Sequence, residues 1–167
     1  MKMISYRGML IVTMAAGLSL NAQQGAGELG KSKAPPKVVF VCEHGAAFSI
    51  MAKAEFERMA KQHGLNFTIL ARGTNPNPEV SASVRQGLRS DGMEVGAEKP
   101  LKVTAADLKG AARVITFGPD LSSWLSDGVK PLDWSATPSG SYRAASDYIR
   151  KQVEILLDDL GREAKRK

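Results

Sequence analysis

The chain has 167 residues, of which 43% are hydrophobic and 24% are charged, and this composition suits one globular domain with a substantial core. Its formal net charge of +6 fits anionic ligands. The positive charges do not gather on one periodic face, which argues against a nucleic-acid-binding surface.

The chain opens with a pattern typical of an export signal. A basic start with Lys2 and Arg7 precedes an apolar stretch at residues 9–20, which is short for a membrane span. The small residue Ala22 follows as a cleavage position, and no cysteine follows there to carry a lipoprotein anchor. We therefore expect residues 1–22 to be removed and the mature protein to be periplasmic or secreted, without membrane attachment. The alternative is a disordered or weakly anchored N-terminus.

A polar linker and an alternation of strands and helices follow. Residues 23–37 are polar and hold Pro35-Pro36, which predicts a linker. Short apolar runs predict buried strands, and helical spacing of apolar residues predicts helices. The predicted strands are 38–41, 67–72 and 113–117, and the predicted helices are 49–63, 81–91, 104–110 and 141–160. Residues 121–140 read as a loop, with Trp124 and Trp134.

Several helix ends carry sequence signals. Gly64 is expected to follow the first helix in a left-handed conformation, and Thr104 to cap the third. Gly161 is expected to end the last helix, leaving 162–167 as a solvated basic tail. The alternation predicts a three-layer α/β/α domain over residues 38–161, with a central parallel sheet of about four strands. Ligands of such sheets bind beyond the carboxyl ends of the strands.

Cys42, the only cysteine, lies at that edge of the predicted sheet. It ends the first strand, and Ser49 opens the following helix. Backbone N–H groups of the intervening loop, with the helix N-terminus, form an anion-binding nest that would also stabilise a thiolate. The loop residues are Glu43, His44, Gly45, Ala46, Ala47 and Phe48. A thiolate in such a loop suits attack on phosphorus or arsenic, and the Ser49 hydroxyl can donate to the sulfur. The alternative is an inert buried cysteine.

Residues 38–56, VVFVCEHGAAFSIMAKAEF, resemble the start of the low-molecular-weight protein tyrosine phosphatase and arsenate reductase family. That family carries an apolar strand, then Cys, five residues, Arg, Ser and a helix. The resemblance continues through Ala71-Arg72-Gly73-Thr74, the third predicted strand and residues 134–140, and so covers residues 37–160. It implies a cysteine-based hydrolase of phosphomonoesters of the phosphotyrosine type.

Three departures from the family pattern put catalysis in doubt. The family's loop arginine, which clamps the oxyanion, is replaced by Phe48. The family's general-acid aspartate stands before a proline in the late loop, and the matching pair here is Thr137-Pro138. The loop asparagine is replaced by Gly45. The resemblance therefore implies that Cys42 and Ser49 keep their roles, while turnover is impaired or altered.

Three residues are candidates to replace the missing groups. Arg72 ends the second strand and is a candidate compensating cation, or else an ordinary surface arginine. Asp133 is a weak candidate for the general acid, or else a turn residue after Pro131. His44 can donate to an oxyanion or sense pH, or else faces solvent. The carboxylate of Glu43 would raise the thiol pKa if it pointed inward, so we expect it to point outward.

Three functions remain open. The first is an exported phosphatase with altered catalysis, and the second is a non-catalytic module that binds an oxyanion or a partner. The third is an arsenate reductase resolved by an external thiol, because the thioredoxin-linked route needs a second cysteine where Gly118 stands. We expect a small oxyanion or phosphorylated substrate and no cofactor. We expect no metal either, because His44, His63 and Cys42 do not form a ligand cluster.

Overall fold

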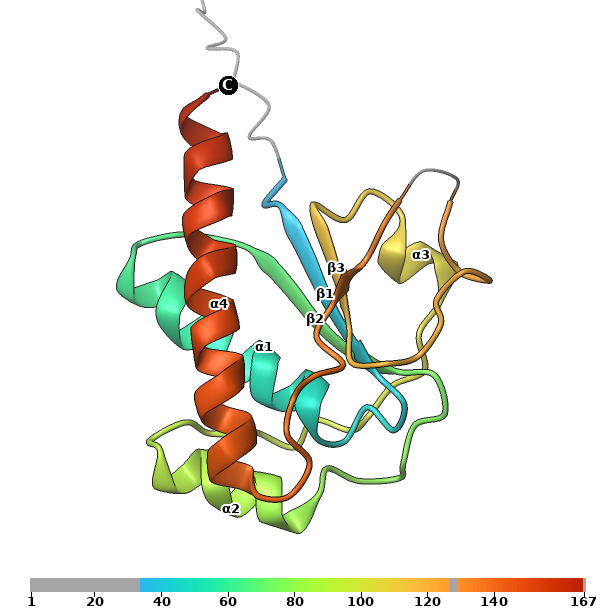
Figure 1. Ribbon diagram of the computed structural model, residues 1–167, viewed down its shortest axis with the longest axis vertical. Coiled ribbons are helices and arrows are strands. Elements are labelled where there is room, and N and C mark those ends of the chain that lie inside the picture. Colours follow the sequence, from blue (N-terminus) through green and yellow to red (C-terminus); the bar gives the residue numbers. More distant parts are fainter. Residues whose placement is uncertain (1–33, 127–128, 167) are drawn as a thin grey trace, which may run out of the picture. The chain divides into compact units, whose positions relative to one another are not determined.

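The computed structural model describes residues 34–126 and 129–166, so the predicted signal peptide at 1–22 lies outside the described residues. Four parallel strands form one sheet in the order β2-β1-β3-β4 (Figure 1). The strands are β1 (Lys37–Cys42), β2 (Thr68–Gly73), β3 (Arg113–Thr116) and β4 (Leu132–Asp133), and the helices are α1 (Phe48–Gln62), α2 (Ala82–Ser90), α3 (Ala105–Leu108) and α4 (Tyr142–Lys165). The predicted fold class is confirmed.

The first strand lies inside the sheet, between β2 and β3. Its residues from Val38 to Val41 are fully buried, as expected for a strand covered on both faces. At its carboxyl end Cys42 is paired with Gly73 of β2, and Val41 is paired with Thr116 of β3. The ends of three strands therefore meet at one edge, and Cys42 lies on that edge.

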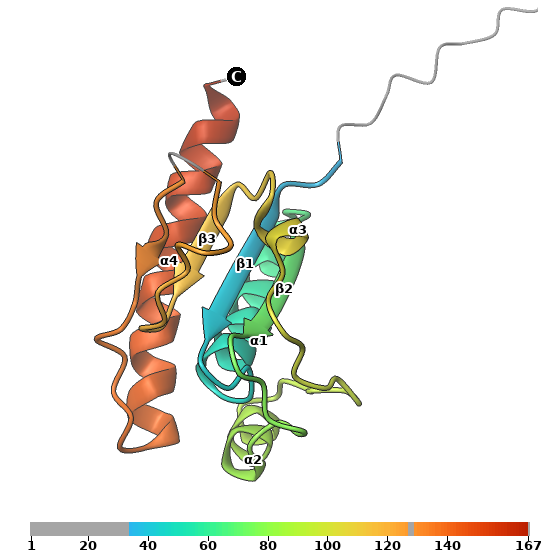
Figure 2. The same ribbon diagram turned by 90° about the vertical axis from the view of Figure 1, so that its right-hand side faces the viewer.

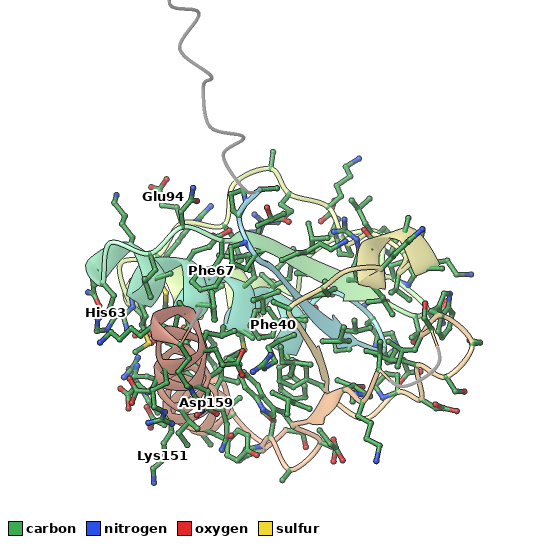
Figure 3. All side chains as sticks on the ribbon, turned by 90° about the horizontal axis from the view of Figure 1, so that it is seen from above. Phe40, His63, Phe67, Glu94, Lys151 and Asp159 are labelled. Atoms are coloured by element: carbon green, nitrogen blue, oxygen red, sulfur yellow. The ribbon has the colours of Figure 1, made fainter. Side chains whose placement is uncertain are left out.

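The two faces of the sheet are covered by different layers. Helices α1 and α4 lie on one side of the strands and α3 on the other (Figure 1), and Figure 2 gives the view at right angles. On the first face Phe40, Phe56 and Ile149 belong to the larger core, which also includes Cys42. Seen from above, Phe40 and Phe67 lie between helices and sheet, while the side chain of Lys151 projects outward (Figure 3).

The second face has a smaller core, built from Val39 and Val41 of β1 together with Leu108 of α3 and Leu121. Side chains alternate along a strand, so Val41 and Cys42 point to opposite faces. This alternation decides which side chains of the neighbouring strands lie on the same face of the sheet as the sulfur of Cys42.

A buried carboxylate ties α1 to α4 beneath the first face. Glu55 is only 3% exposed. It accepts hydrogen bonds from Arg58 Nη2 at 2.5 Å and from Arg150 Nε at 3.0 Å. Both guanidinium groups compensate its charge, and the bond to Arg150 fixes the middle of α1 against α4.

Most helix ends follow the predicted signals, but the end of α4 does not. Gly64 has a φ of 65° after α1, and Thr104 caps α3 in a reciprocal capping box with Asp107. The prediction that Gly161 ends the last helix is wrong, since α4 continues to Lys165. An ion pair between Arg113 and Glu163 holds this extra turn, which outweighs the modest cost of glycine inside a helix.

The short strand β4 lies within residues 121–140, for which the sequence predicts a loop. A strand of two residues gives no periodic signal, so the sequence does not predict it. Among the described residues, the structure has no helix long and apolar enough to cross a membrane.

Candidate functional site

Cys42 and Ser49 are brought together at the junction of β1 and α1. The Sγ atom of Cys42 lies 3.2 Å from the Oγ atom of Ser49, and the two residues are 5% and 0% exposed. The strand fixes the first residue and the first turn of the helix fixes the second. A hydroxyl in this position can donate to a thiolate, as the sequence predicts.

The loop between them is anchored through its carbonyl groups. Four carbonyl oxygens accept hydrogen bonds from the chain after β2, namely those of Cys42, Glu43, His44 and Ala46. The donors are the N–H groups of Thr74, Asn75, Asn77 and Ser81, at 2.8–3.1 Å. The loop is therefore held from outside by segment 74–81.

The N–H groups of the same loop differ from its carbonyl groups. In the part of the chain that the structure describes, none of the N–H groups from His44 to Ser49 donates to a protein acceptor. Gly45, Ala46 and Ser49 are buried residues of this run, and buried donors seldom stay without a partner. A run of such donors at a helix N-terminus favours an anion, and anion binding by residues 43–48, which we call the anion loop, stays a prediction.

A close backbone contact between two glycines shapes this loop. Gly45 has a φ of 60°, a conformation that favours glycine. A Cβ atom on Gly73 would lie 2.6 Å from the N atom of Gly45, and one on Gly45 would lie 2.9 Å from the N atom of Gly73. Only glycine at both positions lets β2 approach the loop this closely.

Phe48 occupies the position of the family's arginine and packs against aromatic residues. Its ring centroid lies 5.7 Å from that of Phe117, which lies 5.8 Å from that of Trp134. We call Phe48, Phe117 and Trp134 the aromatic cluster. The side chain of Phe48 has no hydrogen-bond donor, so the loop offers an anion its backbone but no charged clamp.

The loop of residues 134–140, which we call the late loop, offers no acid at the expected place. Thr137 is buried, and its hydroxyl donates to the carbonyl oxygen of Trp134 at 2.7 Å. Asp133 is exposed, and its Oδ1 atom accepts from the N–H of Ser135 at 2.8 Å. Asp133 is paired with Thr116, which pairs with Val41, so Asp133 is on the face opposite to Cys42. The structure thus shows a turn aspartate and does not bring Asp133 to the sulfur.

Arg72 is also on the opposite face. It is paired with Val41 across the sheet, and its Nη2 atom donates to Asp107 Oδ1 at 2.9 Å. Burial raises the pKa of Asp107, but hydrogen bonds from Arg72 and Thr104 outweigh this and the net pKa is lowered. The guanidinium therefore joins β2 to α3, and the structure does not place it in the anion loop.

The charged loop residues Glu43 and His44 face outward. Their side chains are 66% and 51% exposed, with Glu43 Oε1 3.8 Å from His44 Nε2. Glu43 thus has the outward orientation expected from the sequence, and His44 keeps its solvent-facing alternative. Within residues 34–126 and 129–166, no group of three or more His, Cys, Asp or Glu side chains is arranged to hold a metal ion.

Sequence reasoning missed the aromatic cluster and the contact between Gly45 and Gly73. Phe117 was assigned only to a strand, and no local pattern links it to Phe48, 69 positions earlier. The glycine pair had one signal, the Gly-Thr step after β2 that resembles a family segment.

Comparison with known proteins assigns the family. The model of the family described as low molecular weight phosphotyrosine protein phosphatase matches residues 37–123, which is more than half of the chain. The chain belongs to this family. Its matched segment runs from the first residue of β1 through β3, and so includes Cys42, the anion loop and Ser49. Among curated proteins, none is similar enough to this chain to count as a match.

Solved structures share the fold at low sequence identity. A thioredoxin-dependent arsenate reductase of Corynebacterium glutamicum has a TM-score of 0.70 and 24% identity, covering 80% of this chain. The chain spans only 66% of that protein. A low molecular weight protein tyrosine phosphatase of T. tengcongensis has a TM-score of 0.60 and 18% identity, with 74% and 99% of the two chains covered. The YwlE arginine phosphatase of Geobacillus stearothermophilus has a TM-score of 0.60 and 21% identity, and the match covers 79% of this chain and 97% of that protein.

Proposed function

We propose that this protein is an exported member of the family that binds a phosphomonoester or a related oxyanion in the loop around Cys42, with impaired turnover. The observation that carries the proposal is the buried pair of Cys42 Sγ and Ser49 Oγ, 3.2 Å apart, next to a loop whose N–H groups from His44 to Ser49 have no acceptor among the described residues. The family membership supports phosphomonoesters as the substrate class.

The chemistry that remains is nucleophilic. The thiolate of Cys42 attacks phosphorus, an S–P bond forms, and the bond from phosphorus to the ester oxygen breaks. The Ser49 hydroxyl stabilises the thiolate, and water later hydrolyses the S–P bond. The departing oxygen needs a proton, which a threonine cannot supply at neutral pH, and the Thr137 hydroxyl is already hydrogen-bonded to the protein. The oxyanion also lacks its arginine, so both charge-stabilising contributions are reduced.

A second candidate, a non-catalytic module that binds an oxyanion or a partner, is favoured by the packing of Phe48. Its ring is built into the aromatic cluster, so the loss of the arginine is accommodated by the surrounding structure. A third candidate is an arsenate reductase that takes its electrons from an external thiol. The similarity to the reductase fold supports it only weakly, since Cys42 is the only cysteine.

Steady-state hydrolysis of an aryl phosphomonoester and calorimetric binding of vanadate separate these candidates. We expect vanadate binding together with slow hydrolysis that the change Cys42→Ser abolishes. Vanadate binding with no hydrolysis above the Cys42→Ser background would establish the non-catalytic module instead. Arsenate-dependent consumption of an added monothiol would establish the reductase. If vanadate does not bind, the anion loop has no function of this kind.

Export is the remaining part of the proposal, and it rests on the basic start and apolar stretch of residues 1–22. We expect the mature protein in its native host to begin near Gln23. Intact-mass measurement of the protein from cell fractions tests this, and a full-length product confined to the cytoplasm would contradict it.

A further inference from the structure

An open hollow lies beside the anion loop, at the carboxyl edge of the sheet. It has a volume of about 450 Å³, and it is lined by Glu43, Thr74, Phe117, Gly118, Pro119 and Asp120. Two of these residues connect it to the loop. Glu43 directly follows Cys42, and Phe117 packs on Phe48. A ligand whose anionic end binds in the loop therefore has this hollow for the rest of its structure.

The hollow is acidic. Its lining holds two carboxylates, Glu43 and Asp120, and none of its lining residues is a lysine or an arginine. The carboxylate of Asp120 accepts hydrogen bonds from the N–H and the hydroxyl of Ser122, each at 2.9 Å. These bonds lower the pKa of Asp120, so it is ionised at neutral pH. Glu43 is largely exposed, and its Oε1 atom lies 3.8 Å from the Nε2 atom of His44.

This charge distribution disfavours a simple dianion. Phe48 removes the positive charge that the family places next to the sulfur, and Arg72 is bound to Asp107 on the other face of the sheet. The backbone N–H groups of the loop attract an anion, while the two carboxylates next to them repel it. A ligand that carries a cation close to its phosphate turns this repulsion into attraction.

We propose that the ligand of this site is a zwitterion, a phosphate monoester that carries a cationic ammonium or guanidinium group, with the phosphate in the loop around Cys42 and the cation between Glu43 and Asp120. This rests on the proposed function, since it assigns the substrate class of the same site. The ligand's own cation offsets the charge that the change from arginine to Phe48 removed, and the two carboxylates are specificity-determining residues.

The test compares two probes that differ in one charge. Phosphoethanolamine and ethyl phosphate have similar size, but only the former carries an ammonium group. Protection of Cys42 from alkylation gives the dissociation constant of each probe at pH 8. We expect phosphoethanolamine to bind about 2- to 30-fold more tightly at low ionic strength, the range for two exposed ion pairs. The preference should shrink in 0.5 M salt.

Variants assign the preference to the two carboxylates. The double change Glu43→Gln with Asp120→Asn should abolish it, leaving ethyl phosphate binding equal or tighter. The matched control is Asp158→Asn, an exposed carboxylate on α4, and it should keep the preference. Because Glu43 and Asp120 are at the surface, the double variant should fold, which thermal unfolding verifies.

The outcomes separate this inference from the proposed function. Equal affinity of the wild type for both probes overturns the zwitterion proposal and leaves an oxyanion site. A preference that survives in the Glu43→Gln/Asp120→Asn variant overturns the role of the two carboxylates. If ethyl phosphate, phosphoethanolamine and vanadate all fail to protect Cys42, the proposed function itself is wrong.

Discussion

The two sides of the candidate site differ in which of the family's catalytic groups they keep. On the nucleophile side, Cys42 and Ser49 are buried in contact, and the loop between them is fixed by hydrogen bonds to segment 74–81. On the opposing side, Phe48 and Thr137 stand where the resemblance places the arginine and the acid, and both pack into the protein. The backbone part of the site persists, while the side-chain charges are absent.

The difference shows which parts of the site the fold itself requires. The loop conformation depends on Gly45, Gly73 and a row of main-chain hydrogen bonds, which also join β1 to the chain after β2. The arginine and the acid contribute to transition-state stabilisation and not to the sheet, so aromatic and hydroxyl side chains can fill their places. We therefore expect binding of an oxyanion and its hydrolysis to be separable in this protein.

Restoring both lost groups should have the largest effect. The double change Phe48→Arg with Thr137→Asp supplies a clamp and an acid, and a positioned acid contributes about 10²- to 10⁴-fold. We expect turnover of an aryl phosphate to rise by at least about 10²-fold, mainly in kcat, because both groups act in the transition state. Steady-state kinetics measures this, with Cys42→Ser in the same background as the control. An inactive but folded double variant would show that the opposing side needs more than two residues.

Disturbing the glycine contact should damage the nucleophile side. The change Gly73→Ala places a Cβ atom 2.6 Å from the backbone N of Gly45, so the loop must move. We expect a loss of about 3 kcal/mol in unfolding free energy and loss of anion binding. Gly96→Ala is the matched control, since a Cβ atom there meets nothing within 4 Å. Equal urea midpoints for the two variants would contradict the close approach.

Arg72 tests whether a cation from β2 serves the site. Its ion pair with Asp107 predicts that Arg72→Met lowers stability by about 2 kcal/mol and leaves oxyanion binding unchanged. Urea unfolding and vanadate calorimetry on the same variant separate the two effects. A large loss of binding with normal stability would instead return Arg72 to the role of compensating cation.

The smallest effect is expected where α4 begins, directly after the late loop. Tyr142 donates to Asp91 Oδ2 at 2.8 Å, and burial together with this bond raises its pKa to about 12. Because the folded pKa exceeds the unfolded value of about 10, the stabilisation is complete below pH 10 and is lost as the pH rises to 12. Tyr142→Phe should cost about 1 kcal/mol at pH 8 and flatten this decline. Tyr148→Phe is the control, and an identical decline in both variants would contradict the assignment.

The sequence predicted the nucleophile side better than the opposing side. The position of Cys42 follows from local signals, an apolar run, a small-residue loop and a helical pattern in consecutive order. The partner of Arg72 depends on strand register, which decides the face on which a side chain lies. Arg72 is paired with Val41, and Cys42, one position further along β1, points to the other face. The aromatic cluster joins the first residue of α1 to residues that directly follow β3 and β4, so local patterns did not reveal it.

Alkylation of Cys42 with and without saturating phosphate, arsenate or vanadate tests the central claim most directly, because it reports on the anion loop whether or not the protein turns over substrate. The loop N–H groups, which find no acceptor in the described part of the chain, predict that at least one of these oxyanions slows alkylation strongly, in a concentration-dependent manner. Equal alkylation rates with and without all three would contradict the claim that the nucleophile side is a functional oxyanion site.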